Sequence, residues 1–188
     1  MTLCGALSVA VVSSVCVACF TQQSASSKRM SDSKEWTTAN LNVAVAGSFC
    51  YGDAEANCRQ YGRLYTWGAA QQGCRSLGDG WRLPTDDEWR LLAKQYGGVL
   101  EDSADSGKAA YAALLNGGNS GFDAVMGGSL TPDDGKYARL EEHGFYWSAT
   151  ETNPGSALFY NFGKSGSALN RQREGAKGMA ISVRCVRD

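Results

Sequence analysis

The stretch GWRLPTDDEWRLLAKQYGG, residues 80–98, contains the clearest folding signal of this chain. Thr85 can accept a hydrogen bond at the first turn of a helix, and Glu88, three residues later, can complete a capping box. The apolar residues that follow recur at i, i+3, i+4 and i+7, which is the spacing of one helical face: Trp89, Leu92, Ala93 and Tyr96. Two glycines then end the pattern. The stretch predicts a capped helix that buries one apolar face.

The segments before and after this helix differ in their hydrophobic period. Upstream, residues 36–42 are typical of an opening strand, and residues 64–70 lead into a helix that ends near Gly78. Downstream, a third helix is expected over residues 108–115. Short apolar stretches separated by glycine then predict five strands: residues 122–126, 139–142, 145–150, 157–162 and 179–186. Helices followed by strands predict an α+β fold, with two to three helices on a largely antiparallel, twisted sheet.

The last predicted strand, residues 179–186, has an alternating pattern of side chains. Ile181, Val183 and Cys185 alternate with Ser182 and Arg184. Because side chains point to opposite faces along a strand, this period of two predicts a strand with one buried face.

The composition of the 188 residues excludes several classes of function. Eighteen Lys and Arg against 19 Asp and Glu give a net charge of −1, which argues against a nucleic-acid partner. The single histidine, His143, excludes multi-histidine metal sites, and its neighbours Glu142 and Gly144 favour a surface turn. A calcium loop of the D-x-D-x-D-G type is absent. We expect no metal, no cofactor and no enzymatic activity.

The N-terminal segment is predicted to direct export. Residues 3–20 contain no charged side chain, and the segment Val15–Cys19 resembles the lipobox of bacterial lipoproteins, in which Cys19 would become the lipidated N-terminus. The segment differs from the usual lipobox in two ways. No basic residue precedes the apolar run, and Cys16 stands where Leu is usual. A plain signal peptide or a helical anchor are the alternatives. Residues 1–19 are therefore assigned to the signal peptide, and the Ser-rich residues 20–35 to a flexible tether.

The cysteines fit an exported protein. Seven are present, and after removal of the signal region and lipidation of Cys19 four remain, an even number that an oxidising compartment favours. Cys50 and Cys58 enclose a short loop, so Cys74 is left to pair with Cys185. Closing so long a loop stabilises a fold by about 4–5 kcal/mol in the chain-entropy model. A zinc site is disfavoured because the sequence has no C-x-x-C pair. The remaining alternative is that these four cysteines are reduced in a cytosolic protein.

Five motifs in fixed order carry a family resemblance. They are CYGD at residues 50–53, YGRLYTW at 61–67, GWRLPT at 80–85, YWSATE at 146–151 and SVRCVRD at 182–188. Together they resemble the Fibrobacter succinogenes major paralogous domain family over residues 36–188. The resemblance implies an exported, often lipid-anchored protein with a C-type-lectin-like fold. It also implies kinship to formylglycine-generating enzymes and to the variable proteins that retroelements diversify in bacteria and phages, with a variable-type region at about residues 145–188.

The function that follows is ligand binding by residues 148–175, supported from behind by Trp81, Trp89 and Trp147. Polar side chains such as Asn, Tyr and Ser suit an adaptable recognition surface. The candidate ligand-binding residues are Thr150, Glu151, Asn153, Ser156, Tyr160, Asn161, Lys164, Asn170, Arg171 and Arg173. The alternative is that this region is a solvent-exposed face of strands and loops with no binding role.

We therefore expect a lipoprotein of the bacterial cell envelope, at the outer membrane or the cell surface. It would adhere to a protein or glycan ligand and contact the membrane through its N-terminal lipid. Two other functions remain open. One is a structural component of a surface assembly such as a pilus tip. The other is an envelope enzyme of the formylglycine-generating branch, which requires a free thiol.

Overall fold

The computed structural model describes residues 25–188. The predicted signal peptide and the lipidation site at Cys19 lie outside these residues. The helices are α1 (Glu55–Tyr61), α2 (Trp67–Arg75), α3 (Asp86–Lys94) and α4 (Lys108–Leu114), with 3-10 turns η1 (Tyr51–Asp53) and η2 (Leu100–Asp102). Within the described part of the chain, no helix has the length and hydropathy needed to cross a membrane.

The capping box predicted at the start of α3 is confirmed. Thr85 Oγ1 accepts a hydrogen bond from the Glu88 N–H at 3.3 Å, and Glu88 Oε2 accepts one from the Thr85 N–H at 2.9 Å. The predicted apolar face is buried at its centre, where Trp89 and Leu92 are both 0% exposed. The cap and the buried face fix where α3 begins and which side of it packs on the sheet.

The strands form three antiparallel sheets. The first has the order β1 (Ser27–Arg29), β2 (Glu35–Thr37), β11 (Val186–Arg187). The second has the order β3 (Ser48–Phe49), β4 (Leu64–Tyr65), β10 (Ala180–Ile181), β5 (Ser129–Thr131), β6 (Lys136–Ala138). The third has the order β7 (His143–Asn153), β8 (Ser156–Gly163), β9 (Ala168–Ala176). Together with the four helices these sheets give the predicted α+β fold.

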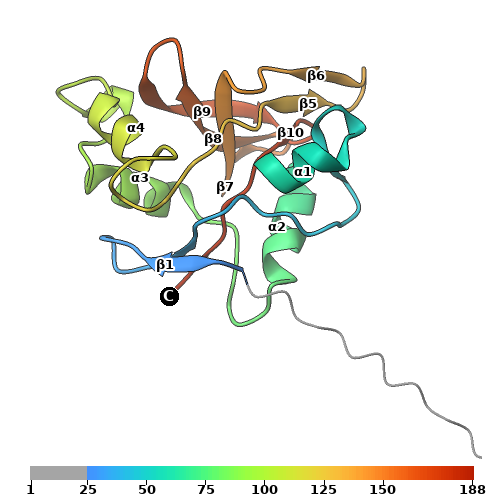
Figure 1. Cartoon of the computed structure of the whole chain (residues 1–188), viewed down its shortest axis with the longest axis horizontal. Coiled ribbons are helices and arrows are strands. Elements are labelled where there is room, and N and C mark those ends of the chain that lie inside the picture. Colours follow the sequence, from blue (N-terminus) through green and yellow to red (C-terminus); the bar gives the residue numbers. More distant parts are fainter. Residues whose placement is uncertain (1–24) are drawn as a thin grey trace, which may run out of the picture.

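Helices α2, α3 and α4 pack against the third sheet. In Figure 1, α3 and α4 lie on one side of β7–β9, and α1 and α2 lie on the other side of the view. One cluster of buried residues lies where α3 and α4 meet this sheet and includes Trp36, Trp89 and Phe122. A second cluster surrounds the disulfide of α2 and contains Trp147, Val183 and Cys185.

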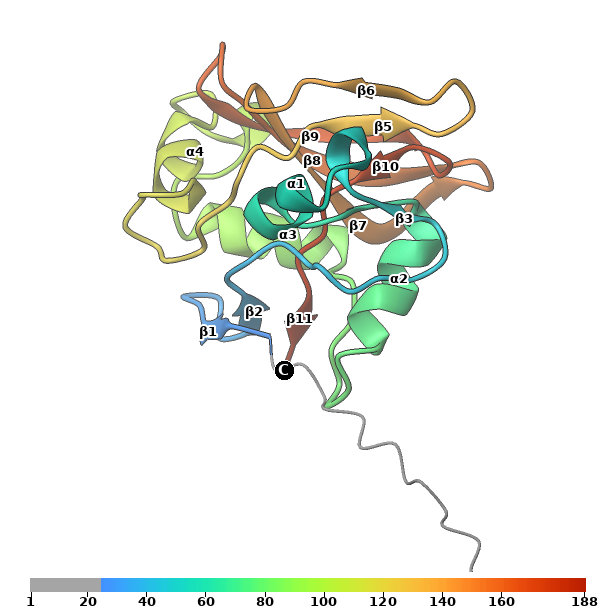
Figure 2. The same ribbon diagram turned by 45° about the vertical axis from the view of Figure 1, so that its right-hand side comes forward.

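The first and last strands of the described residues lie in one sheet. Trp36 of β2 pairs with Val186 of β11, and Figure 2 shows these strands side by side next to the C-terminus. The predicted flexible tether over residues 20–35 is wrong for its last part. Residues 27–29 and 35–37 form a hairpin, and Met30 between them is 5% exposed. Burial of Met30 and Trp36 together explains why a Ser-rich segment is ordered here.

The last segment does not form the predicted half-exposed strand. Only Ala180–Ile181 and Val186–Arg187 are in strands, and every residue from 181 to 186 is buried. Arg184 is 0% exposed and donates to the carbonyl oxygens of Thr37 and Phe122 at 2.8 and 2.6 Å. Burial lowers the pKa of the Arg184 guanidinium. The alternation of polar and apolar residues is misleading because both polar side chains are buried: the Arg184 guanidinium is satisfied by carbonyl oxygens, whereas Ser182 Oγ has no hydrogen-bond partner within residues 25–188.

Several other predicted elements need correction. Residues 122–126 and 139–142 do not form strands, because Asp123, Arg139 and Glu141 have φ of +54°, +63° and +61°, values that lie in the left-handed region and interrupt an extended backbone. The expected opening strand, residues 36–42, extends only to Thr37. The sequence did not predict α1, which lies where a loop was expected, or β9, whose residues are mostly polar.

Both predicted disulfides are confirmed. Cys50 is bonded to Cys58 with a Cα–Cα distance of 5.0 Å, and Cys74 to Cys185 with 5.6 Å. The second bond ties α2 to the buried segment before β11. It therefore joins the helical half of the fold to the C-terminal strands.

Candidate functional site

The third sheet presents two chemically different faces. Across β8, the register places Tyr146 opposite Tyr160 and Tyr160 opposite Arg171, and places Phe145 opposite Asn161 and Asn161 opposite Asn170. Paired residues point to the same side of a sheet, and consecutive residues point to opposite sides. We call the side with Tyr160 the inner face and the side with Asn161 the outer face.

The inner face is covered by α3 and α4. The Trp89 ring stacks on the Tyr160 ring with a centroid distance of 4.9 Å and an angle of 19°. Tyr111 of α4 approaches Phe162 of β8 with a centroid distance of 6.3 Å. Tyr160 and Phe162 are 0% exposed. The inner face is therefore part of the core.

Asp86 connects the start of α3 to all three strands. Arg171 donates from Nε and Nη2 to its two carboxylate oxygens at 2.7 and 2.6 Å, and the Tyr160 hydroxyl donates to Oδ1 at 2.8 Å. The Asp86 N–H donates to Thr150 Oγ1 of β7 at 2.9 Å. Because Asp86 is only 6% exposed, this network is a buried clamp.

The clamp keeps its charges. Burial by itself raises the pKa of the Asp86 carboxyl, but the hydrogen bonds from Arg171 and Tyr160 outweigh it, so the pKa lies below its ordinary value. The hydrogen bond to Asp86 raises the pKa of Arg171. Asp86 and Arg171 are therefore an ion pair at neutral pH, and neither is a proton donor for catalysis.

The outer face carries aromatic and uncharged polar side chains. Its members occupy one side of β7, β8 and β9 and are all at least partly exposed: His143, Phe145, Phe159, Asn161, Asn170 and Gln172. The His143 and Phe145 rings stack at 5.1 Å with an angle of 9°, and the Phe145 and Phe159 rings meet edge to face at 5.9 Å. At one end Phe159 packs on the buried ring of Trp147. The rings of the outer face form a continuous row.

The amides of the outer face are not fully used by the protein. Asn161 Oδ1 bonds His143 Nδ1 at 2.9 Å, and Asn170 Nδ2 donates to the Ala168 carbonyl at 3.3 Å. Within residues 25–188, no hydrogen bond engages Asn161 Nδ2, Asn170 Oδ1 or the side chain of Gln172. These groups are available to a ligand, since an amide offers both donors and acceptors.

The ten predicted ligand residues fall in separate places. Asn161 and Asn170 lie on the outer face, as a ligand surface requires. Tyr160 is buried and Arg171 is held by Asp86, so the structure removes both from the candidate surface. Thr150 is used by the Asp86 clamp. The remaining five lie at the rims of the sheet: Glu151, Asn153 and Ser156 at the β7–β8 hairpin, Lys164 after β8, and Arg173 on the inner side of β9.

Sequence reasoning did not single out four outer-face residues: His143, Phe145, Phe159 and Gln172. His143, expected in a surface turn, is instead the first residue of β7. The sequence does contain a spacing that indicates a shared face, because the outer-face residues of each strand stand two positions apart. The pairs are His143 and Phe145, Phe159 and Asn161, and Asn170 and Gln172. The register of the three strands brings these pairs together, and one sequence does not contain that register.

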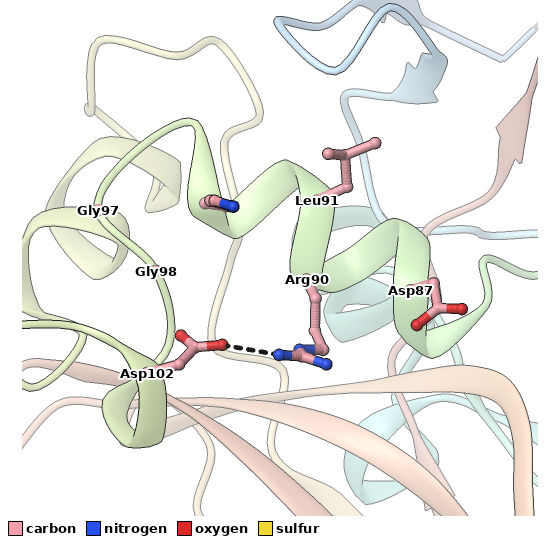
Figure 3. A pocket seen from close by; sticks show the side chains of 7 residues that line it. Asp87, Arg90, Leu91, Gly97, Gly98 and Asp102 are labelled. Carbon is pink, nitrogen blue, oxygen red and sulfur yellow. Dashed lines mark hydrogen bonds and ion pairs between the residues drawn. The ribbon is translucent and has the colours of Figure 1, made fainter.

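A cleft of 410 Å³ lies beside α3, on the side of the sheet away from the outer face. It is lined by Asp87, Arg90, Leu91, Lys94, Gly97, Gly98 and Asp102. Figure 3 shows Arg90 reaching Asp102, at 3.2 Å, while Leu91 projects from α3 in another direction. The Arg90–Asp102 pair is well exposed, so it contributes little to stability. The cleft mixes both charges and contains no histidine or cysteine, and it offers no catalytic arrangement.

One group of side chains in the described part of the chain brings metal-ligating atoms together. Cys50, Glu55 and Cys58 hold their ligand atoms within 4.8 Å of one another. The two sulfur atoms are joined in a disulfide, however, and a disulfide provides no thiolate for a metal.

Comparison with known proteins agrees with the sequence motifs. No curated protein matches this chain. The model of the Fibrobacter succinogenes major domain matches residues 21–187, which include the β1–β2 hairpin, both disulfides and the whole third sheet. Because the match covers nearly the full length, the chain belongs to the Fibrobacter succinogenes major domain family.

Proposed function

We propose that this chain is an exported binding protein of the bacterial cell envelope, anchored by a lipid on Cys19, that contacts its ligand with the outer face. The observation that carries the proposal is the set of unengaged amide groups beside partly exposed phenyl rings. Aromatic and amide side chains supply contact area and hydrogen bonds at low entropy cost, as in other recognition surfaces. The C-type-lectin-like relationship is part of this proposal.

The scaffold behind the outer face supports this function. The Asp86 clamp fixes β7, β8 and β9 to α3, and Gly175 lies so close to the Trp147 and Phe159 rings that an added Cβ would approach both to 2.7 Å. A surface held in one shape loses little entropy when a ligand binds. The rigidity favours recognition by preformed strands.

Binding without catalysis is the better proposal for this surface. All four cysteines in residues 25–188 are in disulfides, which leaves no thiol there for chemistry of the formylglycine-generating type. His143 is engaged by Asn161 and, at 3.3 Å, by Arg139. A general base needs a nitrogen that can reach a substrate, and both nitrogens of this ring have protein partners.

Two experiments test the proposal. The first is mass spectrometry of the membrane-bound protein, where we expect a lipid on Cys19 and release of a Cys19→Ala variant from the membrane fraction. The second is flow cytometry of the labelled full chain on intact bacterial cells. We expect binding that an Asn170→Ala/Gln172→Ala variant loses and a Lys164→Ala variant keeps. Equal binding by all three would exclude the outer face, and self-association without cell binding would favour a structural assembly component.

A further inference from the structure

We infer that the outer face binds an uncharged carbohydrate; this inference rests on the proposed function and names its class of ligand. Strand register aligns the side chains of this surface in two rows across the sheet. Phe145, Asn161 and Asn170 are aligned across the sheet, and Phe159 is aligned with Gln172. Neighbouring strands lie about 5 Å apart, so the phenyl and amide groups lie next to one another over an area about the size of one or two sugar rings.

The first argument is the apolar row. One side of a pyranose ring exposes C–H bonds that carry a small positive charge, whereas an aromatic ring has a negative face and a positive edge. Phe145 and Phe159 are partly exposed, while Trp147, which continues the row, is 0% exposed. Phe145 and Phe159 pack against the second cluster with part of each ring and expose the rest. The apolar groups that a ligand can reach here are therefore phenyl rings. Aliphatic side chains would provide apolar area without this electrostatic attraction.

The second argument is the number of free hydrogen-bonding groups. Asn161 Nδ2, Asn170 Oδ1 and both ends of the Gln172 amide have no partner within residues 25–188. Sugar hydroxyls both donate and accept, and amides match them because each amide also does both. A protein partner is normally met by a buried apolar centre, and this surface places unpaired amides at its centre.

The third argument is charge. None of the six outer-face residues is Asp, Glu, Lys or Arg. One cation lies at the edge of the outer face, where Arg139 Nη1 donates to His143 Nε2 at 3.3 Å. Arg171 and Lys177 are paired with Asp86 and Glu151 at 2.6 Å. A sulfated, phosphorylated or uronic-acid polymer would therefore find a single positive charge at one end of the surface, whereas binding to such a polymer relies on several. The mainly uncharged surface favours an uncharged polymer.

The experiment measures binding of the full chain to immobilised pentaoses of glucose, xylose, mannose and N-acetylglucosamine, with heparin as a charged comparison. We expect at least one neutral pentaose to bind and heparin not to bind above background. In the Asn170→Ala/Gln172→Ala variant we expect the Kd for that sugar to rise about tenfold or more, because hydrogen bonds are lost. Phe145→Leu, which keeps an apolar side chain but removes the ring, is expected to weaken binding to the same sugar.

The Lys164→Ala variant is the matched control, since Lys164 is exposed in the turn that follows β8 and lies outside the outer face. It should bind like the parent chain. An unfolding curve for each variant shows that it is folded. A neutral sugar that binds equally well to the amide variant would overturn the inference, and so would preference for heparin.

Treatment of the target cells separates this inference from the proposed function. If binding to cells is lost after periodate, which cleaves sugar diols, and survives protease, the carbohydrate inference stands. If binding depends on Asn170 and Gln172 but is lost with protease and survives periodate, the ligand is a protein. The proposed function then holds and the carbohydrate inference is wrong. Absence of any binding to cells or sugars contradicts both.

Discussion

Tyr160 and Asn161 are neighbours on β8, yet they belong to different parts of the protein. Tyr160 points to the inner face, stacks on Trp89 and donates to Asp86. Asn161 points to the outer face, where its NH2 group has no partner within residues 25–188. The inner face uses its polar groups to hold the fold together, whereas the outer face leaves part of each amide without a hydrogen bond within residues 25–188. Polar residues in a strand therefore do not by themselves indicate a binding surface.

The strongest test of this difference is to shorten each side chain in turn. Tyr160→Ala should lower the free energy of unfolding by about 4 kcal/mol, because it removes a buried ring and one of the hydrogen-bond donors to Asp86. Asn161→Ala should change it by less than about 0.5 kcal/mol. Urea denaturation of both variants measures this. Similar losses would show that the two faces do not differ in the way described, and Tyr160→Phe, which keeps the ring, should lie between them.

The second test breaks the buried ion pair and compares it with an exposed one. Asp86→Asn should cost about 3 kcal/mol, since Arg171 would keep its charge without a carboxylate. Asp102→Asn, which disrupts the exposed pair with Arg90, should cost about 0.5 kcal/mol or less. Both values come from denaturant unfolding at pH 7. A cost near zero for Asp86→Asn would mean that the clamp does not hold the inner face.

The third test uses pH. Burial raises the pKa of Glu88, but hydrogen bonds from Arg82 and the Thr85 N–H outweigh it and lower the pKa from 4.5 to about 2. Because the pKa is lower in the folded state, this stabilisation is complete above about pH 5 and is lost as pH falls toward 2. The expected loss is about 2–3 kcal/mol.

The pH profile is measured by urea unfolding from pH 7 to pH 2. Glu88→Gln should flatten it, because the variant has no carboxyl to protonate at this site. Gln172→Ala should leave the profile unchanged, since this outer-face side chain has no hydrogen bond to a titratable group within residues 25–188. A profile that depends on Gln172 and not on Glu88 would contradict the division between the two faces.

The smallest effect on stability is expected for the outer-face amides. The Asn170→Ala/Gln172→Ala variant should unfold within about 0.5 kcal/mol of the parent chain, because neither side chain is buried. Its effect should appear in ligand binding instead. A large loss of stability would place these amides in the fold, like Tyr160, and would remove them from the proposed site.

Local sequence patterns determined several parts of this protein. The capping box at Thr85 and Glu88 is readable because a helix start needs donors and acceptors three residues apart. The helix of residues 108–114 and the two long strands β7 and β8 are readable from their hydrophobic periods. The two disulfides followed from an even number of cysteines in the folded part. The order of the motifs also identified the family.

Tertiary structure alone decided which face each polar side chain occupies. Arg171 and Asn170 are adjacent in sequence and both polar, but the register of β9 directs Arg171 to Asp86, 85 residues away, and Asn170 to the outer face. Arg184 is buried because carbonyl oxygens from residues 37, 122 and 123 surround it. Such contacts join segments far apart in the chain, and local pattern contains no information on which distant segments will meet.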